Sequence, residues 1–337
     1  MKSITIFIIF FLIVSTNLSS SKILNQENID EIGKAYGFYA GQKFFLSRIA
    51  DDYPELKTYA LKVDVEFDSH FFESVQNMEK IAVTILGKEG WQTIKNKVDD
   101  QIKNIDLSRI NKESSINFIE TVERRIQGKA DIPMISTFIS FHPQYSSNPL
   151  YEVLDSLVKE FKTEGLEKTL GLKLGYIVPI TWIEKEARAP HIVKKFVGRR
   201  VDQGLIQFFP LIKEIPIEVK LASRLLGQEE LLEMISSNDV WEEAIPGTKV
   251  IDRGNTTIAG EKASWTKISI ASESTFGTVY GCGIVYTFIY DNKIVQSYYT
   301  VSNIAENTEH GNMKLFELYE DVFKLLASKI YIYNKFE

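Results

Sequence analysis

The stretch Thr278-Val-Tyr-Gly-Cys-Gly-Ile-Val-Tyr-Thr-Phe-Ile-Tyr290 decides the fold expected for the C-terminal half of this chain. Successive side chains of a strand point to opposite faces of the sheet, and neither resulting set is polar enough to face water. The pattern therefore predicts a central strand that is covered on both faces. Gly281 and Gly283 share one face, and we expect a helix to pack low over the sheet there.

The same two-residue period extends outward from this strand. Asp291-Asn292 predicts a tight turn into a strand over 293–301. Helices are expected over about 221–235 and 313–330. The interpretation is an α/β/α sandwich with a mainly antiparallel sheet over 166–337, in which the remaining strands cover 172–178, 191–197, 204–211, 249–251 and 263–270.

Before residue 130 the apolar residues recur at three and four positions, which predicts helices. Gly33, Gly37 and Gly41 lie four apart and suggest a second backbone crossing closely there, because a glycine otherwise weakens a helix by about 1 kcal/mol. The expected helices cover 25–50, about 54–87 with Gly87 at the end, 89–105 and 114–127. The overall class is α+β, with this helical domain over 22–130.

Between the two domains the chain is rich in proline. Pro133, Pro143 and Pro149, together with Ser146-Ser147-Asn148, predict irregular backbone over 131–150. A short helix is expected over about 151–162. Residues 131–165 are therefore interpreted as a linker that contains one short helix.

The first 21 residues predict the location of the protein. Lys2 precedes an apolar run from Ile4 to Val14, followed by small polar residues up to Ser21. The run is roughly half the ~20 residues that a membrane span needs, so it fits a cleaved secretory signal peptide better than an uncleaved anchor. We expect a periplasmic or secreted protein with no membrane span after cleavage.

Composition limits the partners and the redox chemistry. The formal net charge of −6 argues against binding nucleic acid or an anionic membrane. Cys282 is the only cysteine of the 337 residues, so no internal disulfide forms and no cysteine follows the signal to carry a lipid. A lipoprotein is therefore disfavoured, and an exported protein without a disulfide is common in a bacterial periplasm.

No residue grouping predicts catalysis, a cofactor or a metal. Cys282 is expected to be a buried, unreactive thiol among aromatic residues. The four histidines, His70, His142, His191 and His310, have no metal-ligand spacing. Neither a G-x-S-x-G elbow nor a glycine-rich nucleotide loop occurs.

Two charged clusters have simpler interpretations than binding sites. Asp64, Glu66 and Asp68 are expected to lie on the solvated side of a long helix rather than to bind a cation. Lys194-Lys195 and Arg199-Arg200 alternate along a strand, so they share one surface only if the strand ends near Gly198. A turn at the end of the sheet is the expected explanation.

The stretch Gly171-Leu-Lys-Leu-Gly-Tyr-Ile-Val-Pro-Ile-Thr-Trp182, followed by Ile192-Val-Lys-Lys-Phe196, resembles the opening of PsbP-like domains. The resemblance covers about 166–335 and implies an α/β/α sandwich used mostly for protein binding or assembly, with no catalytic residues to carry over. Tyr36-Gly-Phe-Tyr-Ala-Gly41 and Tyr53-Pro-Glu-Leu56 resemble helical segments that precede such domains in uncharacterised exported bacterial proteins.

Three functions remain open. The first is an exported, non-enzymatic factor of the bacterial cell envelope that binds or helps assemble another protein. The second is a periplasmic protein that binds a small molecule or lipid in an aromatic cleft near Tyr286, Tyr298 and Tyr299. The third is a hydrolase with a site between the two domains. The sequence leaves the oligomeric state undetermined.

Overall fold

A computed structural model describes residues 21–105, 111–130, 132–200, 204–215, 227–274, 277–303, 306–333 and 335. The expected signal peptide lies outside these residues, apart from Ser21. The chain divides into two compact units at the bond between residues 152 and 153. We call the described residues up to 152 the helical unit and those from 153 the sandwich unit.

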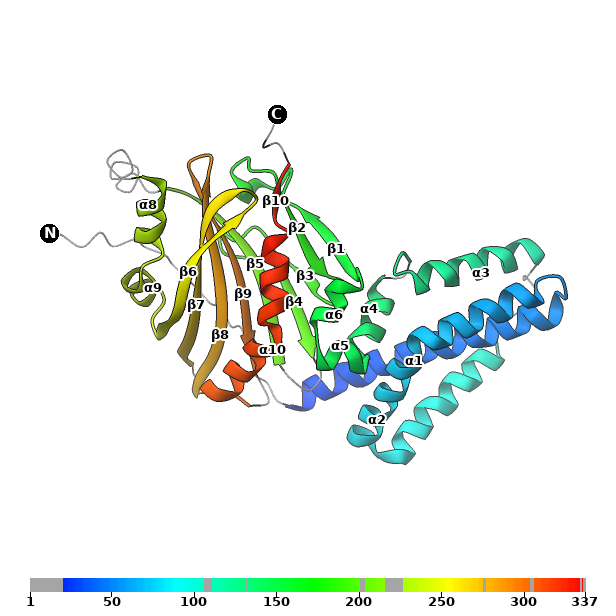
Figure 1. Cartoon of the computed structure of the whole chain (residues 1–337). Coiled ribbons are helices and arrows are strands. Elements are labelled where there is room, and N and C mark those ends of the chain that lie inside the picture. The colour runs from blue at the N-terminus through cyan, green and yellow to red at the C-terminus, as the bar shows by residue number, and fades with distance from the viewer. Residues whose placement is uncertain are drawn as a thin grey trace. The chain divides into compact units, whose positions relative to one another are not determined.

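The helical unit consists of helices that pack on one another (Figure 1). Buried apolar residues at steps of three and four, such as Ala60, Val63, Phe67 and Phe71, form its core. Its helices are α1 (Ser21–Asp52), α2 (Lys57–Lys103), α3 (Lys112–Ile126), α4 (Ile132–Phe141), α5 (Pro143–Ser147) and α6 (Leu150–Leu154), the last of which ends just beyond the division.

Gly87 reverses the chain within α2, as the sequence predicts. Its backbone has φ 73° and ψ 167°, which is outside the helical region and suits a residue without a side chain. Glu79, before the reversal, accepts hydrogen bonds from the Trp91 indole (3.0 Å) and the Lys95 ammonium (2.9 Å), after it. These contacts hold the two arms of α2 against each other as a helical hairpin.

The glycines of α1 play a smaller role than expected. A Cβ on Gly33 would lie 3.7 Å from the Ile94 side chain, and one on Gly37 would lie 3.7 Å from the Val98 side chain. Both are ordinary van der Waals distances to side chains, and a Cβ on Gly41 would contact nothing within 4 Å. The prediction of a closely crossing backbone is therefore wrong; the second arm of α2 packs there through its side chains.

The segment predicted as irregular backbone over 131–150 is largely helical. Pro133 and Pro143 lie in the first turns of α4 and α5, and Pro149 immediately precedes α6. Proline is tolerated in a first helical turn, because the N–H that it lacks has no intrahelical partner there. The expected helix over 151–162 is also corrected, because α6 ends at Leu154 and a strand, β1 (Val158–Lys162), follows.

The sandwich unit contains a seven-stranded and a three-stranded sheet, and every pairing among its described strands is antiparallel. The large sheet has the order β3-β4-β5-β9-β8-β7-β6, and the small one has the order β1-β2-β10. Their bounds are β2 (Leu174–Pro179), β3 (Ile183–Lys185), β4 (Lys195–Arg200), β5 (Gly204–Glu214), β6 (Thr248–Ile258), β7 (Glu261–Ser274), β8 (Gly277–Tyr290), β9 (Lys293–Ser302) and β10 (Tyr331–Ile332), with a 3-10 helix at Glu167–Thr169.

The central strand prediction is confirmed. β8 lies between β7 and β9, and its residues 282–289 are all buried. Asp291 and Asn292, both with positive φ (48° and 56°), form the predicted tight turn into β9.

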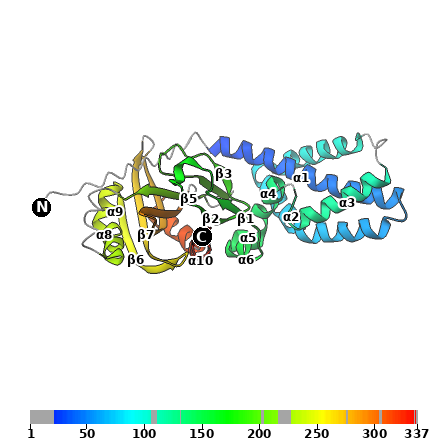
Figure 2. The same cartoon turned by 90° about the horizontal axis from the view of Figure 1, so that it is seen from above.

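Helices cover both faces of the large sheet (Figures 1 and 2). On one face lie α10 (Glu309–Ser328) and the small sheet, and aromatic rings fill this layer: Phe208 stacks on Tyr299 at 4.7 Å and Tyr299 on Phe323 at 5.4 Å between ring centroids. We call this the α10 face. The fold class, α+β with an α/β/α sandwich, is as predicted.

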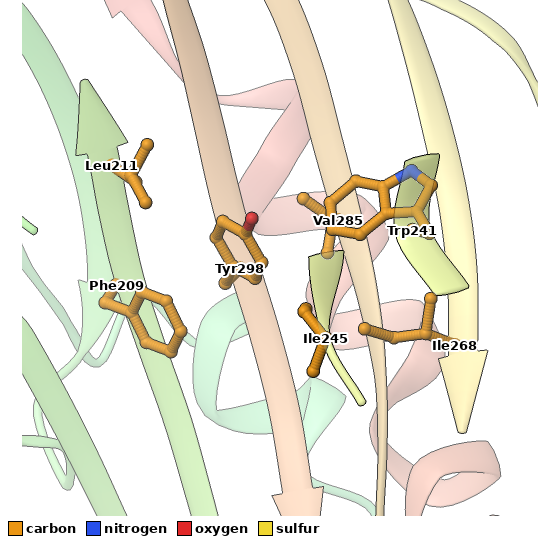
Figure 3. Close-up of a cluster of buried hydrophobic side chains, with 7 residues drawn as sticks. All are labelled: Phe209, Leu211, Trp241, Ile245, Ile268, Val285 and Tyr298. Atoms are coloured by element: carbon orange, nitrogen blue, oxygen red, sulfur yellow. The ribbon is translucent and has the colours of Figure 1, made fainter. Parts of the chain in front are cut away.

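The other face, the α9 face, is covered by α8 (Gln228–Ile235) and α9 (Asn238–Ala244). Figure 3 shows Trp241 and Ile245 lying over Val285, Ile268 and Tyr298 of the sheet. Helix α8 is the described part of the helix expected over 221–235; residues 221–226 lie outside the described residues. Helix α9 was not predicted.

Gly281 and Gly283 do not make room for a helix, which corrects the prediction. A Cβ on Gly283 would lie 2.8 Å from both the Thr300 side chain and the Tyr299 carbonyl of β9, and one on Gly281 would lie 3.3 Å from the Val301 carbonyl. The close neighbour is the adjacent strand. Glycine is needed here because β9 approaches the backbone of β8 closely.

Residues after α10 tie the small sheet to the tip of the β6–β7 hairpin. Strand β10 pairs with β2, and the Tyr331 and Tyr333 hydroxyls both donate to the Glu160 carboxylate of β1. The Lys335 ammonium lies 2.7 Å from the Glu261 carboxylate and donates to the Ala259 carbonyl at 2.6 Å. One short segment thus contacts both sheets.

Candidate functional site

A groove of about 320 Å³ lies on the α10 face between the C-terminal half of α10 and strands β6, β7 and β8. Apolar side chains form much of its lining, including Ile258, Ile284 and Ala327. Ligand sites are commonly concave, apolar and about 300–1,000 Å³ in volume, with few polar groups. We call this the Trp265 groove, after the aromatic side chain on its wall.

Trp265 lies flat against the neighbouring strand because its cross-strand partner is a glycine. Residues 254 and 265 oppose each other in the β6–β7 ladder. A Cβ on Gly254 would approach the Trp265 ring to 2.8 Å, so any larger residue would displace the indole. Trp265 remains half-buried, which leaves part of its ring to the groove.

An ion network joins the two sides of the groove. The Lys267 ammonium of β7 lies 2.6 Å and the Lys324 ammonium of α10 lies 2.7 Å from the same Glu320 oxygen, Oε1. Burial alone raises the pKa of Glu320, but the hydrogen bonds from Lys267 and Lys324 outweigh it and leave the pKa below its ordinary value. Two cations around one carboxylate give the groove lining an excess of positive charge.

The three tyrosines predicted to line one cleft do not share one face, because the sheet separates Tyr298 from Tyr286 and Tyr299. Tyr286 lines the Trp265 groove, and burial followed by the charge of Glu320 raises its pKa. Tyr299 lies on the same face in the core, with its ring centroid 6.0 Å from that of Tyr286. Tyr298 points to the α9 face, where its ring stacks on Phe209 at 4.8 Å (Figure 3).

A second hollow, of about 480 Å³ and more polar, lies on the other side of the β6–β7 hairpin, towards α8. Arg253, Lys262 and Glu229 line it, and Lys262 pairs with Glu229 at 2.6 Å. Trp265 also borders this hollow. Any ligand experiment on Trp265 must therefore distinguish the two sides of the hairpin.

The helical unit has an exposed apolar stripe on α2. Leu61, Val65 and Phe72 are 44%, 68% and 46% exposed. With 100° per residue they lie within about 40° of one another around the helix axis, so they form one stripe. Asp68 lies on the same side of the helix between Val65 and Phe72 and interrupts the stripe. Isolated exposed apolar residues are common on protein surfaces, whereas several on one side of a helix favour an interaction surface.

The acidic cluster beside this stripe differs from the prediction of a solvated face. Asp64 and Asp68 face α1, where the Lys43 ammonium lies 3.7 Å and 3.0 Å from their carboxylates. Tyr39 also donates to Asp68. Burial raises the pKa of Asp64. Glu66 alone behaves as predicted, pairing with Lys62 at 3.7 Å on the surface.

The turn expected near Gly198 is wrong, because β4 continues through this residue to Arg200. Lys194 lies 2.8 Å from Glu184 and 2.5 Å from Glu186, whereas burial lowers the pKa of Lys195. The side chains of Arg199 and Arg200 lie outside the described residues.

The remaining predicted residues are dispersed. Cys282 is 1% exposed, and burial followed by the charge of Glu309 raises the pKa of its thiol to about 12. His142 caps α5 by accepting a hydrogen bond from the Gln144 amide at 3.3 Å, and His70, His191 and His310 are exposed. Across the described ranges, no three His, Cys, Asp or Glu side chains are grouped so as to hold a metal ion.

Sequence reasoning missed Trp265, Lys267, Glu320 and Lys324. A signal existed in part: Trp265 and Lys267 are two apart and share a strand face, and Glu320 and Lys324 are four apart on one helix side. Nothing in the sequence indicated that Glu320 of α10 would lie beside Lys267 of β7.

The fold and the groove define an α+β protein in which a helical unit precedes a doubly covered antiparallel sandwich with a ligand-sized hollow beside α10. Within the described part of the chain, no helix has the length and apolar character of a membrane span. No protein-family model matches the sequence, and no curated protein sequence is significantly similar to it.

Three solved structures are similar to parts of this chain at low sequence identity. The cyanobacterial PsbP (CyanoP) of Synechocystis sp. PCC 6803 is 11% identical, with a TM-score of 0.34 over 52% of this chain and 92% of that chain. LpqN, involved in cell envelope biogenesis of Mycobacterium tuberculosis, is 11% identical, with a TM-score of 0.31, and the match covers 53% of this chain and 94% of LpqN. The Pseudomonas aeruginosa protein PA94, a putative regulator, is 12% identical, with a TM-score of 0.26, and the match covers 51% of this chain and 94% of PA94. At these scores the similarities carry no argument about function.

Proposed function

We propose that this chain is an exported, non-enzymatic protein of the bacterial cell envelope that binds another protein and assists its assembly. The observation that carries the proposal is the apolar stripe Leu61–Val65–Phe72, exposed along α2 of the helical unit. The partner docks an apolar segment on this stripe.

The charges around the stripe specify the chemistry of the partner. The α2 segment from Leu61 to Glu73 contains four carboxylates, Asp64, Glu66, Asp68 and Glu73, and one lysine, Lys62. Lys43 of α1 pairs with Asp64 and Asp68, so the surround keeps an excess of two negative charges. An acidic surround favours an apolar segment flanked by lysine or arginine and repels a second copy of the same surface. The partner is therefore a different protein that presents a basic-flanked apolar helix or strand.

Support for export comes from the sequence. The apolar run from Ile4 to Val14 after Lys2 is typical of a secretory signal peptide. The resemblance of residues 171–196 to PsbP-like domains agrees with a binding or assembly role. Isolation of the mature protein from the periplasmic fraction, with its first residue near position 22, tests the location.

Site-specific photo-crosslinking tests the docking surface. A photoreactive amino acid is placed at Val65 in the full-length chain, in its native bacterium, and at the exposed Glu120 of α3 as a matched control. We expect Val65 to crosslink to one envelope protein, at a segment with apolar residues and basic flanks, and Glu120 to give no such product.

The double variant Val65→Asp/Phe72→Ser completes this test. Both side chains are exposed, so we expect the folding stability to change by less than about 0.5 kcal/mol per site, while the crosslinked complex is lost. Crosslinks only to the chain's own sandwich unit, or to none, would contradict the proposal.

A second candidate function is binding of a small molecule by the sandwich unit. The observation that favours it is the Trp265 groove, whose volume and mixture of aromatic and charged groups fit a ligand site. It is independent of the stripe on α2, so either function can hold without the other.

A further inference from the structure

We infer that the Trp265 groove binds a compact anionic amphiphile: a carboxylate or sulfonate attached to an apolar body about the size of two fused rings. The inference rests on the second candidate function and specifies its ligand class. Three features of the groove carry it, namely its volume, its aromatic wall and its pair of lysines.

The volume sets the size of the ligand. An apolar cavity of about 150 Å³ holds one benzene molecule. The groove measures about 320 Å³, so it accommodates a body of about two rings or a medium-length acyl group. It is too small for a two-chain lipid or a folded peptide segment.

The walls set the polarity of the ligand body. Ile258, Ile284 and Ala327 line the groove with apolar atoms, and the half-buried Trp265 adds an aromatic surface. Aromatic side chains favour offset-stacked or edge-to-face contacts with another ring. A flat apolar body gains this contact in addition to the release of water.

The lysines set the charge of the ligand. Lys267 and Lys324 each have three N–H donors and share a single oxygen of Glu320, so donors remain for a second anion. Asp321 also lies 3.6 Å from Lys324, but its side chain is 76% exposed and does not line the groove. An anion placed at the groove completes the charge balance that Glu320 begins.

Lys267 is positioned to serve this role. Its ammonium lies 5.8 Å from the Trp265 ring centroid and 5.9 Å from that of Phe316, with the side chain 21% exposed. Cation–π contacts of this kind keep a lysine in one place with most of its stem out of water. A ligand carboxylate near Lys267 thus has its apolar body beside Trp265.

The test uses the full chain with 15N-labelled tryptophan, titrated with 2-naphthoate and with its neutral analogue 2-naphthamide. The chain has four tryptophans and so gives four indole N–H signals. The signal that is missing from the Trp265→Phe variant is assigned to Trp265. Trp91, Trp182 and Trp241 are each at most 2% exposed and serve as internal controls. We expect naphthoate to shift the Trp265 signal with a dissociation constant below about 1 mM, and naphthamide to bind about tenfold more weakly.

Two lysine variants locate the anion. Lys324→Gln should weaken naphthoate binding about tenfold and leave naphthamide unchanged, because only the charged contact is removed. Lys262→Gln is the matched control, since Lys262 lies on the same strand as Lys267 but lines the hollow on the other side of the hairpin. It should leave both affinities unchanged.

The outcomes distinguish two claims, that the groove binds a ligand and that this ligand is anionic. Equal affinities for naphthoate and naphthamide would overturn the anionic class while leaving the groove as a ligand site. An effect of Lys262→Gln in place of Lys324→Gln would overturn the assignment to this groove. No shift at Trp265 with either probe would overturn the second candidate function as well. None of these outcomes bears on the stripe of α2.

Discussion

Two tryptophans of the sandwich unit lie over glycines of a neighbouring strand, and they differ in what covers them. Trp182 lies against Gly198 of β4, where a Cβ would come within 2.7 Å of its ring, and it is 2% exposed. Trp265 lies against Gly254 of β6 at 2.8 Å and is only half-buried. The local packing is the same in both places, because an aromatic ring fills the space above a glycine.

The difference comes from α10. Its Phe323 packs edge-on against Trp182, with ring centroids 6.3 Å apart, and so closes the layer above that ring. One turn further along, α10 presents the small residues Ala327 and Ser328 towards the hairpin that carries Trp265, which leaves the groove. The side chains that α10 presents to each tryptophan therefore decide whether the ring is buried in the core or left to line a groove.

Replacing each tryptophan by alanine should give the largest difference in the free energy of unfolding between the two positions. We expect Trp182→Ala to reduce the free energy of unfolding of the sandwich unit by about 4 kcal/mol, because a fully packed ring is lost and a cavity remains. Trp265→Ala should reduce it by only about 1 kcal/mol. Denaturant unfolding followed by labelling of Cys282, the only thiol of the chain, reports on this unit alone. Equal losses would break the distinction between core and groove.

Replacing each of these glycines by alanine should also destabilise the Trp182 position more than the Trp265 position, but the difference in the free energy of unfolding should be smaller. In Gly198→Ala the new Cβ meets a ring that has no space to move, and we expect a loss of about 2 kcal/mol. In Gly254→Ala the indole can tilt into the groove, so the loss should stay below about 1 kcal/mol while naphthoate binding weakens. The same Cys282 labelling and the tryptophan titration measure the two effects.

The charge beside Trp265 should make its surroundings depend on pH. The pKa of Glu320 is lowered in the folded chain, so its contribution to stability is fully present above its ordinary value of 4.5 and is lost as the pH falls through the lower, folded value. We expect a loss of less than about 1 kcal/mol. The Trp265 indole signal should move in the same pH range, because Lys267 is then released. Glu320→Gln is the control and should remove this transition; its persistence would assign it to another group.

The smallest expected effect on stability comes from Trp265→Phe. We expect a change below about 0.5 kcal/mol, because an aromatic ring is kept at a half-buried position. The fluorescence should nevertheless change strongly. Trp91, Trp182 and Trp241 are nearly inaccessible, so Trp265 should account for most of the emission that acrylamide quenches. Unchanged quenching in the variant would show that Trp265 is covered.

Much of the fold could be predicted because its signals are local. The two-residue period of 278–290, the turn at Asp291-Asn292 and the break at Gly87 each depend on a few neighbouring residues, and each is confirmed. The errors at 131–150 arose from treating proline as a helix breaker where it begins a helix. Strand β1 was taken for helix because five residues hold too little periodicity to separate the two.

The candidate site could not be predicted, because it depends on distant parts of the chain lying together. Lys267 and Glu320 are 53 positions apart, and only the placement of α10 over β8 and β9 brings them to 2.6 Å. The roles of Gly281 and Gly283 were missed for a related reason, since the space above a glycine can be filled by a strand, a helix or a ring. Tyr286 and Tyr298 were assigned to one cleft although their faces depend on the register of β8 with β9.

The late position of β10 has a consequence for biogenesis. Strand β2 lies between β1 and β10, and more than 150 residues of chain separate Leu174 from Ile332. The small sheet therefore lacks its third strand, and the β6–β7 hairpin lacks its tie to Lys335, until the chain as far as residue 335 has left the ribosome. This ordering delays closure of the sandwich until late in synthesis.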